Sequence, residues 1–126
     1  MQKKVLVIED HPDSRQMLEL VLKEKGYTVI TAEDGLAGLH LAKVEKPDAI
    51  ITNINMPNLD GAEMIKQVRQ IPELRQVPIV VLSAVRTDDP EALINVGATA
   101  VTSKPVELKV FLETLNKALH GIAEQG

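Results

Sequence analysis

Short apolar runs alternate with longer amphipathic segments along the whole chain. The runs at 5–8, 28–32, 49–52, 77–82 and 98–102 are rich in Val, Ile, Leu, Ala and Thr, as is typical of strands buried inside a parallel sheet. Between them, apolar residues recur every three or four positions, a pattern that predicts helices. The chain is therefore predicted to alternate strand and helix from end to end.

Residues that start or stop helices flank these amphipathic segments. Pro12 suits the first turn of the first helix and Gly26 its end, while Asp34 can cap the second helix. Either Asp88 or Asp89 can cap the fourth helix. The apolar positions expected to form the helix faces are Met17, Leu18, Val21 and Leu22; Ala37, Leu41 and Val44; Met64, Ile65 and Val68; and Leu108, Phe111, Leu112, Leu115 and Leu119.

Every connection between consecutive strands is long enough for a helical crossover, which favours parallel strands. The pattern thus predicts an α/β fold with a doubly wound five-stranded parallel sheet and helices on both of its faces. A length of 126 residues fits one domain. We place that domain at residues 1–120 and treat residues 121–126 as a C-terminal tail that frays.

Composition narrows the possible functions. Only 2% of the residues are aromatic, so the core must be aliphatic. The net charge is −4 and no basic cluster is present, so we expect no nucleic-acid binding. The absence of cysteine excludes disulfides and thiolate metal sites. The first apolar run is too short for a signal peptide or a membrane span, so we expect a cytoplasmic protein.

Polar residues follow four of the predicted strands, at the edge where doubly wound sheets bind ligands. They are Glu9 and Asp10, then Asn53, Ser83 and Lys104. Adjacent carboxylates repel unless a cation or a lysine joins them, and their oxygens suit Mg²⁺. Taken singly, Asp10 could be a helix cap, Ser83 a turn cap and Lys104 a solvated surface lysine. Taken together, these residues predict one pocket for a cation and an anion.

Four strings carry a resemblance that is more specific than any single residue: VLVIEDHP at 5–12, NINMPNLDG at 53–61, VVLSA at 80–84 and SKP at 103–105. With these spacings the chain resembles, over nearly its whole length, the receiver domain of two-component response regulators. The single-domain, chemotaxis-regulator-like members are the most similar. This resemblance implies a flavodoxin-like fold with strand order 2-1-3-4-5 and a signalling protein rather than an enzyme.

The resemblance also implies a role for each residue of the predicted pocket. In receivers, an acidic pair, the phosphoacceptor aspartate and a backbone carbonyl two residues later bind Mg²⁺. A Ser or Thr after the fourth strand and a lysine before a proline contact the phosphoryl group. The matching residues here are Glu9, Asp10, Asn53 and the carbonyl of Asn55 for the metal, and Asn53, Ser83 and Lys104 for the phosphoryl group.

Two positions depart from the family pattern. Asn53 stands where the phosphorylated aspartate is expected, and a neutral carboxamide oxygen is too weak a nucleophile to form a stable acyl phosphate. The missing charge should also weaken Mg²⁺ binding. Val101 stands where many receivers carry an aromatic residue that turns inward on activation. We therefore do not expect the usual coupling from Ser83 to an aromatic side chain.

Three functions compete at this point. The chain could be a phosphorelay receiver in which Asn53, natural or introduced, blocks phosphorylation; the intact Glu9, Asp10, Ser83 and Lys104 favour a parent protein with working chemistry. It could instead be a naturally degenerate, phosphorylation-independent interaction module. The third alternative, a nucleotide- or flavin-binding enzyme, is disfavoured because the first loop lacks the glycines that let backbone approach a phosphate.

The resemblance implies two kinds of protein partner. A sensor histidine kinase or a phosphotransfer protein would act on the acceptor site, and a downstream effector would contact the fourth helix, fifth strand and fifth helix. Exposed groups expected on that face are Arg86, Glu91, Asn95 and Glu107. We expect a monomer or a weak homodimer, with no nucleic-acid or membrane partner. The Lys104–Pro105 bond can be cis or trans.

Overall fold

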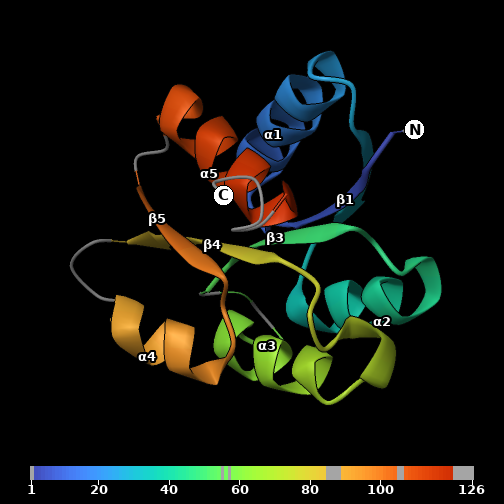
Figure 1. Cartoon of the computed structure of the whole chain (residues 1–126), viewed down its shortest axis with the longest axis vertical. Coiled ribbons are helices and arrows are strands. Elements are labelled where there is room, and N and C mark those ends of the chain that lie inside the picture. The colour runs from blue at the N-terminus through green and yellow to red at the C-terminus, as the bar shows by residue number, and fades with distance from the viewer. Residues whose placement is uncertain (1, 55, 57, 85–88, 105–106, 121–126) are drawn as a thin grey trace.

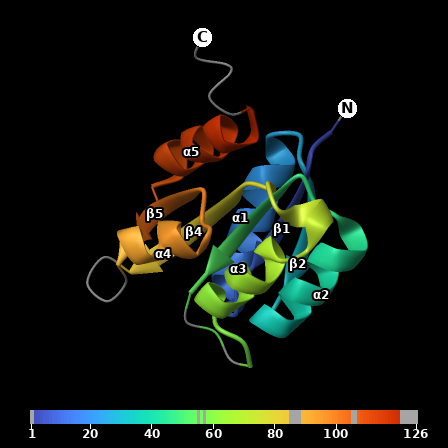
Figure 2. The ribbon, with the colours of Figure 1, turned by 60° about the horizontal axis from the view of Figure 1, so that its bottom comes forward.

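A computed structural model describes residues 2–54, 56, 58–84, 89–104 and 107–120. A single five-stranded sheet lies between two layers of helices: α1 and α5 cover one face, and α2, α3 and α4 cover the other (Figures 1 and 2). The elements, in chain order, are β1 Lys4–Ile8, α1 Pro12–Glu24, β2 Thr28–Ala32, α2 Gly35–Glu45, β3 Ala49–Asn53, α3 Gly61–Arg69, the 3-10 helix η1 Pro72–Leu74, β4 Ile79–Ala84, α4 Pro90–Val96, β5 Ala100–Lys104 and α5 Leu108–His120.

All neighbouring strands are parallel, and their order across the sheet is β2-β1-β3-β4-β5. The predicted fold class is therefore confirmed. In this register Ile8 lies opposite Thr52, Asn53 lies opposite Leu82, and Ala84 lies opposite Lys104. The carboxyl ends of β1, β3, β4 and β5 consequently share one edge of the sheet.

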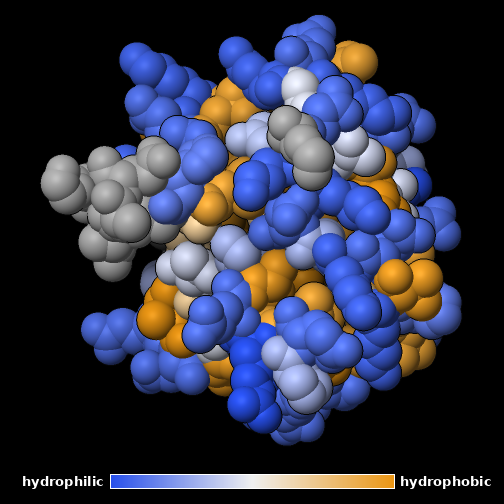
Figure 3. Space-filling view, turned by 45° about the vertical axis from the view of Figure 1, so that its right-hand side comes forward, coloured by the Kyte–Doolittle hydropathy of each residue, from blue (hydrophilic) through white to orange (hydrophobic). Residues whose placement is uncertain are grey.

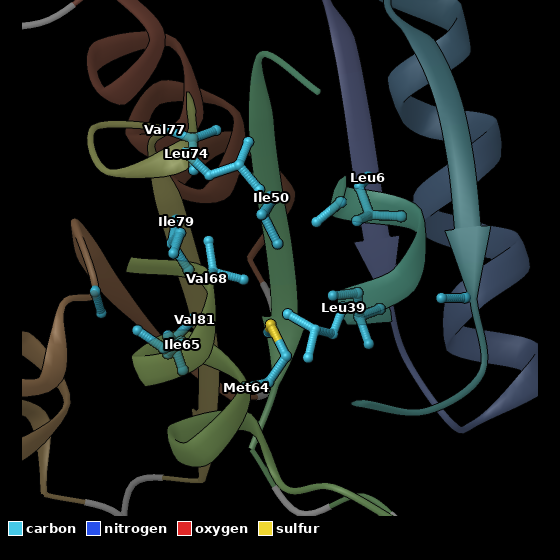
Figure 4. Packing of buried hydrophobic residues seen from close by; sticks show 14 of the residues in the cluster. Leu6, Leu39, Ile50, Met64, Ile65, Val68, Leu74, Val77, Ile79 and Val81 are labelled. Atoms are coloured by element: carbon cyan, nitrogen blue, oxygen red, sulfur yellow. The ribbon is translucent and has the colours of Figure 1, made fainter. Parts of the chain in front are cut away.

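The sheet divides the hydrophobic core into two clusters. Successive strand residues point to opposite faces, so Leu6 belongs to the cluster under α2, α3 and α4, whereas its neighbour Val7 belongs to the cluster under α1 and α5. Figure 4 shows the first cluster, in which Met64, Ile65 and Val68 of α3 pack against strand residues. The second cluster includes Leu18, Leu22, Phe111 and Leu115. Burial on both faces explains why the strands are almost uniformly aliphatic.

β4 and β5 begin two residues later than predicted. The sequence pattern indicated strands at 77–82 and 98–102, but the strands are Ile79–Ala84 and Ala100–Lys104. The backbone N–H of Val77 donates to Leu74 in the turn after η1, and that of Ala98 donates to Leu93 at the end of α4. The apolar residues Val77 and Ala98 therefore lie in turns that precede the strands. The periodicity of apolar residues cannot distinguish such a turn residue from the first residue of a strand.

The buried face of α2 differs from the predicted one. We expected Ala37, Leu41 and Val44 to face the core. Leu41 is partly buried and packs against the core, but Ala37 is exposed and Val44 is 60% exposed. A Cβ on Gly38 would come within 2.5 Å of Ile8 Cδ1, so the helix approaches β1 through its glycine. Glycine has no apolar side chain, so Gly38 did not contribute to the periodic pattern from which the buried face of α2 was predicted. The residues that are buried are Gly35, Gly38, Leu39 and Ala42.

The structure shows which residues cap α4 and α1, a question that the sequence left open. Asp89 Oδ1 accepts a hydrogen bond from Glu91 N at 3.0 Å, so Asp89 caps α4, whereas Asp88 lies outside the described residues. The N-cap of α1 is His11, which makes no side-chain capping bond. Asp10 is therefore not the cap of α1, and its carboxylate is available for other contacts.

The surface carries scattered apolar side chains. Figure 3 shows a face on which hydrophilic residues predominate and apolar residues form small separate patches. The most exposed large apolar side chains among the described residues are Leu20 on α1 and Leu36 and Val44 on α2. None of the helices in the described ranges is long and apolar enough to cross a membrane.

Candidate functional site

The ends of β1 and β3 bring Glu9, Asp10 and Asn53 together. Ile8 pairs with Thr52, so the residues that follow them emerge side by side at the carboxyl edge of the sheet. Asn53 Nδ2 donates to Glu9 Oε2 and to Asp10 Oδ1, each at 3.2 Å. These three predicted site residues therefore form one contact cluster.

Hydrogen bonds to both the oxygen and the nitrogen of the Asn53 carboxamide determine its orientation. The backbone N–H of Ile54 donates to Asn53 Oδ1 at 2.8 Å, so the amide oxygen faces the main chain. The NH₂ group faces the two carboxylates, which can only accept when ionised. Rotating the amide by half a turn would place its oxygen against two carboxylates and its NH₂ against an N–H donor.

Glu9 is held by more than Asn53. Its side chain is buried, and Oε2 also accepts a hydrogen bond from the His11 backbone N–H at 3.1 Å. Its carbonyl oxygen accepts from Arg15 Nη1 at 2.9 Å, and Arg15 Nη2 lies 3.5 Å from Glu33 Oε1. Sequence reasoning missed Arg15. A cation in the first turn of the helix that follows an acidic pair is a weak signal that could have indicated it.

The Asp10 carboxyl experiences opposing influences. Partial burial acts to raise its pKa, but hydrogen bonding to the Glu9 side chain, to its own backbone and to Asn53, together with the nearby charge of His11, outweighs burial. The pKa of Asp10 is therefore lowered below its ordinary value. Asp10 remains an anion, which favours the contact with the Asn53 NH₂ group.

Two residues that follow Asn53, Ile54 and Asn58, make short contacts with neighbouring elements. The Gly61 N–H donates to the Ile54 carbonyl at 2.8 Å, and a Cβ on Gly61 would lie 2.9 Å from Ile54 Cα and closer still to the Asn53 carbonyl oxygen. Asn58, with a φ of 72°, donates from Nδ2 to Asp34 Oδ2 at 2.8 Å. The segment is thereby attached to the N-terminal ends of both α3 and α2.

The remaining predicted site residues are placed less completely. Ser83 is buried near the end of β4, one residue beyond Leu82, the partner of Asn53. The backbone of Lys104 ends β5 opposite Ala84, but its side chain lies outside the described residues. Asn55, Pro105 and Arg86 also lie outside them. Of the other residues expected to be exposed on the predicted effector face, Glu91, Asn95 and Glu107 are indeed exposed.

Comparison with known proteins agrees with this geometry. Residues 5–116 match the response regulator receiver domain. The chain belongs to that family. It is 31% identical over 120 residues to the polar-differentiation response regulator DivK of Brucella anthropi, covering 94% of this chain and 98% of that protein. The chemotaxis response regulator CheY4 of Vibrio cholerae is 36% identical with a TM-score of 0.86, covering 94% of this chain and 99% of that one.

A third relative bears on the metal. The receiver domain of the sensor histidine kinase PA1611 of Pseudomonas aeruginosa has a magnesium ion coordinated in its active site cleft; it is 26% identical with a TM-score of 0.88, covering 96% of this receiver and 100% of that domain. Mg²⁺ needs oxygen ligands at near-octahedral positions. In this receiver Glu9 and Asp10 offer oxygens, but Asn53 presents hydrogens. In this amide orientation the three side chains do not fit a magnesium ion.

The surrounding side chains do not make up the missing ligand. Across the described ranges, no group of three or more His, Cys, Asp or Glu side chains is arranged to hold a metal ion. Thr52, next to Asn53, is fully buried, and its hydroxyl donates to the Asn53 carbonyl at 2.8 Å. The carboxyl edge of this receiver thus combines two acids with one amide.

Proposed function

We propose that this receiver domain belongs to a two-component phosphorelay and that Asn53 blocks aspartyl phosphorylation in the chain as it stands. The observation that carries the proposal is the position of Asn53 at the end of β3, with its amide nitrogen 3.2 Å from both acids. Acyl phosphate formation requires a carboxylate oxygen to attack phosphorus. The Asn53 oxygen is neutral and accepts the Ile54 N–H, so it lacks the charge for that attack.

The rest of the phosphoryl-transfer machinery is retained in sequence. We assign to Ser83 and Lys104 the contacts with a phosphoryl group, and to Glu9, Asp10 and the Asn55 carbonyl a magnesium site weakened by the missing charge of residue 53. The partner that would supply phosphate is a sensor histidine kinase or a phosphotransfer protein in the cytoplasm. The family itself and the buried positions of Glu9 and Ser83 support this assignment.

A second candidate is a phosphorylation-independent interaction module. Ile94 on α4 and Leu108 and Val110 on α5 are between 38% and 45% exposed, which suits contact with an effector through the α4–β5–α5 face. Val101 on β5 is half-buried and packs against the core, with no aromatic ring at that position to move. Such a module would act as a monomer or a weak homodimer and would bind its effector without phosphate.

Replacing Asn53 by Asp separates the two candidates. We expect the purified Asn53→Asp variant, incubated with Mg²⁺ and a small phosphodonor such as acetyl phosphate, to gain the mass of one phosphoryl group. The unmodified chain should gain none. A variant that also gains none would favour the interaction module, and phosphorylation of the unmodified chain would contradict the block.

A matched control guards against phosphorylation elsewhere. Asn116 is exposed on α5, so Asn116→Asp introduces the same carboxylate away from the acidic pair. This variant should gain no phosphoryl mass under identical conditions. In the Asn53→Asp variant, the added group should map to residue 53 and should be lost on treatment with base, as expected of an acyl phosphate.

A further inference from the structure

We infer that the Asn53 carboxamide takes the place of the metal cation, so that the acidic pair of this receiver is held together by internal hydrogen bonds and does not depend on Mg²⁺. This inference deepens the proposed function, because it rests on residue 53 being the phosphoacceptor position. It goes beyond the loss of one ligand charge. An NH₂ group directed at the two acids donates a hydrogen bond to each of them, whereas a smaller apolar side chain would donate none.

The contacts of the acidic pair support this role. One nitrogen, Asn53 Nδ2, carries two hydrogens and lies 3.2 Å from an oxygen of each acid. Glu9 is buried, and a buried carboxylate next to a second one is costly unless donors or cations satisfy it. The Arg15 guanidinium, which lies near, binds the Glu9 carbonyl and Glu33 rather than the paired carboxylates. Within the described part of the chain, Asn53 is thus the side-chain donor that both acids share.

The amide is also held against rotation. Coordination of a metal through Asn53 Oδ1 would require the oxygen to turn towards the acids, which would break three hydrogen bonds and leave the Ile54 N–H facing an NH₂ group. Ile54 has little freedom to compensate, because its carbonyl accepts the Gly61 N–H. The two backbones lie so close together that a Cβ on Gly61 would be only 2.9 Å from Ile54 Cα. A metal must therefore displace an intact network before it can bind.

The Asn53→Ala variant distinguishes this role from a simple loss of charge. Alanine has the same charge as asparagine but has no N–H donor. If only the charge at residue 53 governed Mg²⁺ binding, Asn53→Ala would respond to the metal no more than the unmodified chain. If the amide replaces the cation, removing it should take one donor away from each acid while their negative charges remain close together, and Asn53→Ala should respond more.

The test is thermal unfolding of the unmodified chain, Asn53→Ala and Asn53→Asp with and without millimolar MgCl₂. We expect the Tm of the unmodified chain to change little, and the Tm of both variants to rise with Mg²⁺. The apparent Mg²⁺ affinity of Asn53→Ala should exceed that of the unmodified chain by about tenfold, the equivalent of roughly one charge-assisted hydrogen bond. Equal responses of the unmodified chain and Asn53→Ala would overturn the inference.

A second measurement needs no folded variant. The two side-chain NH₂ signals of Asn53 in a ¹H–¹⁵N spectrum should exchange slowly with solvent and keep their positions on addition of MgCl₂. Shifts of these signals at millimolar Mg²⁺ would overturn the inference. Both measurements are independent of phosphorylation. An Asn53→Asp variant that fails to take up phosphate would contradict the proposed function, but the inference that the amide replaces the cation would still be tested by the response to Mg²⁺.

Discussion

Asn53 and aspartate differ by the exchange of one carboxylate oxygen for an NH₂ group. At the end of β3 this exchange replaces repulsion between residue 53 and the acidic pair by two hydrogen bonds of 3.2 Å. The same exchange removes the nucleophilic oxygen that acyl phosphate formation needs. In the proposed function, a single residue would therefore make the resting site more favourable and at the same time block phosphorylation.

Gly61 tests how firmly the position of Asn53 is fixed. We expect Gly61→Ala to lower the free energy of unfolding by about 1–3 kcal/mol, because the new Cβ would meet the backbone of Asn53 and Ile54, which cannot rotate away. In Gly38→Ala the new Cβ meets the Ile8 side chain, which can adjust, so its cost should be smaller. Urea unfolding of both variants measures the difference. A larger cost at Gly38 would contradict this account of the segment.

At the scale of single residues, the sequence predicted the site only in part. Glu9, Asp10 and Asn53 could be placed together because each follows a buried run at the same edge of a parallel sheet. The direction of the Asn53 amide could not be predicted, because it depends on the Ile54 N–H and on two acids from another strand. The contact of Arg15 with the Glu9 carbonyl was missed because it depends on helix geometry.

α2 and the segment after β3 are joined through one carboxylate. Asp34 Oδ1 caps α2 by accepting from the Ala37 N–H at 2.8 Å, while Asp34 Oδ2 accepts from Asn58 at 2.8 Å. These hydrogen bonds, led by the one from Ala37, lower the pKa of Asp34 below its ordinary value of 3.8. Asp34 therefore stabilises both a helix end and the segment that follows the acceptor position.

Substitution of Asp34 should cost more than the loss of an ordinary cap. Asp60 is a matched control, because it caps α3 in the same way through the Glu63 N–H at 2.9 Å. We expect Asp60→Ala to lower the free energy of unfolding by about 1 kcal/mol and Asp34→Ala by more, since the Asn58 contact is also lost. Chemical unfolding near neutral pH checks this order, and equal costs would contradict the link between α2 and the segment.

The pH dependence of Asp34 has a definite sign. A carboxyl with a lowered pKa stabilises the fold fully above its unfolded-state value, and this stabilisation is lost as the pH falls through the folded-state value. Asp34→Asn should retain a cap but lose this dependence. We therefore expect the stability of the unmodified chain to fall more steeply below about pH 4 than that of Asp34→Asn. Parallel curves would contradict the assignment.

Element boundaries were predicted less well than element types. Every predicted strand and helix exists, but β4 and β5 start two residues late because Val77 and Ala98 belong to the preceding turns. The predicted face of α2 was right at Leu41 but wrong at Ala37 and Val44, because Gly38 provides a close approach to β1 that no apolar pattern shows. Close packing of the backbone determines both the strand starts and the buried face of α2. Such packing is harder to predict from the sequence than the burial of apolar side chains.

The whole molecule explains why so few residues define the site. A parallel sheet in the order β2-β1-β3-β4-β5 collects the carboxyl ends of all five strands at one edge, and those of β1, β3, β4 and β5 contribute the polar residues of the predicted pocket. This arrangement was predictable, because alternating strands and helices leave few alternatives. The positions of Ser83 and Lys104 at this edge were predictable for the same reason, whereas strand order does not determine the directions of their side chains.

The most direct test of the central claim is a crystal structure of the Asn53→Asp variant with Mg²⁺ and trifluoroberyllate, a phosphoryl mimic. We expect the metal to lie between Glu9, Asp10 and residue 53, and the mimic to bind the new carboxylate within reach of Ser83 and Lys104. The unmodified chain, treated identically, should bind neither. A mimic bound away from these residues, or bound equally to the unmodified chain, would contradict the assignment of residue 53 as the blocked phosphoacceptor position.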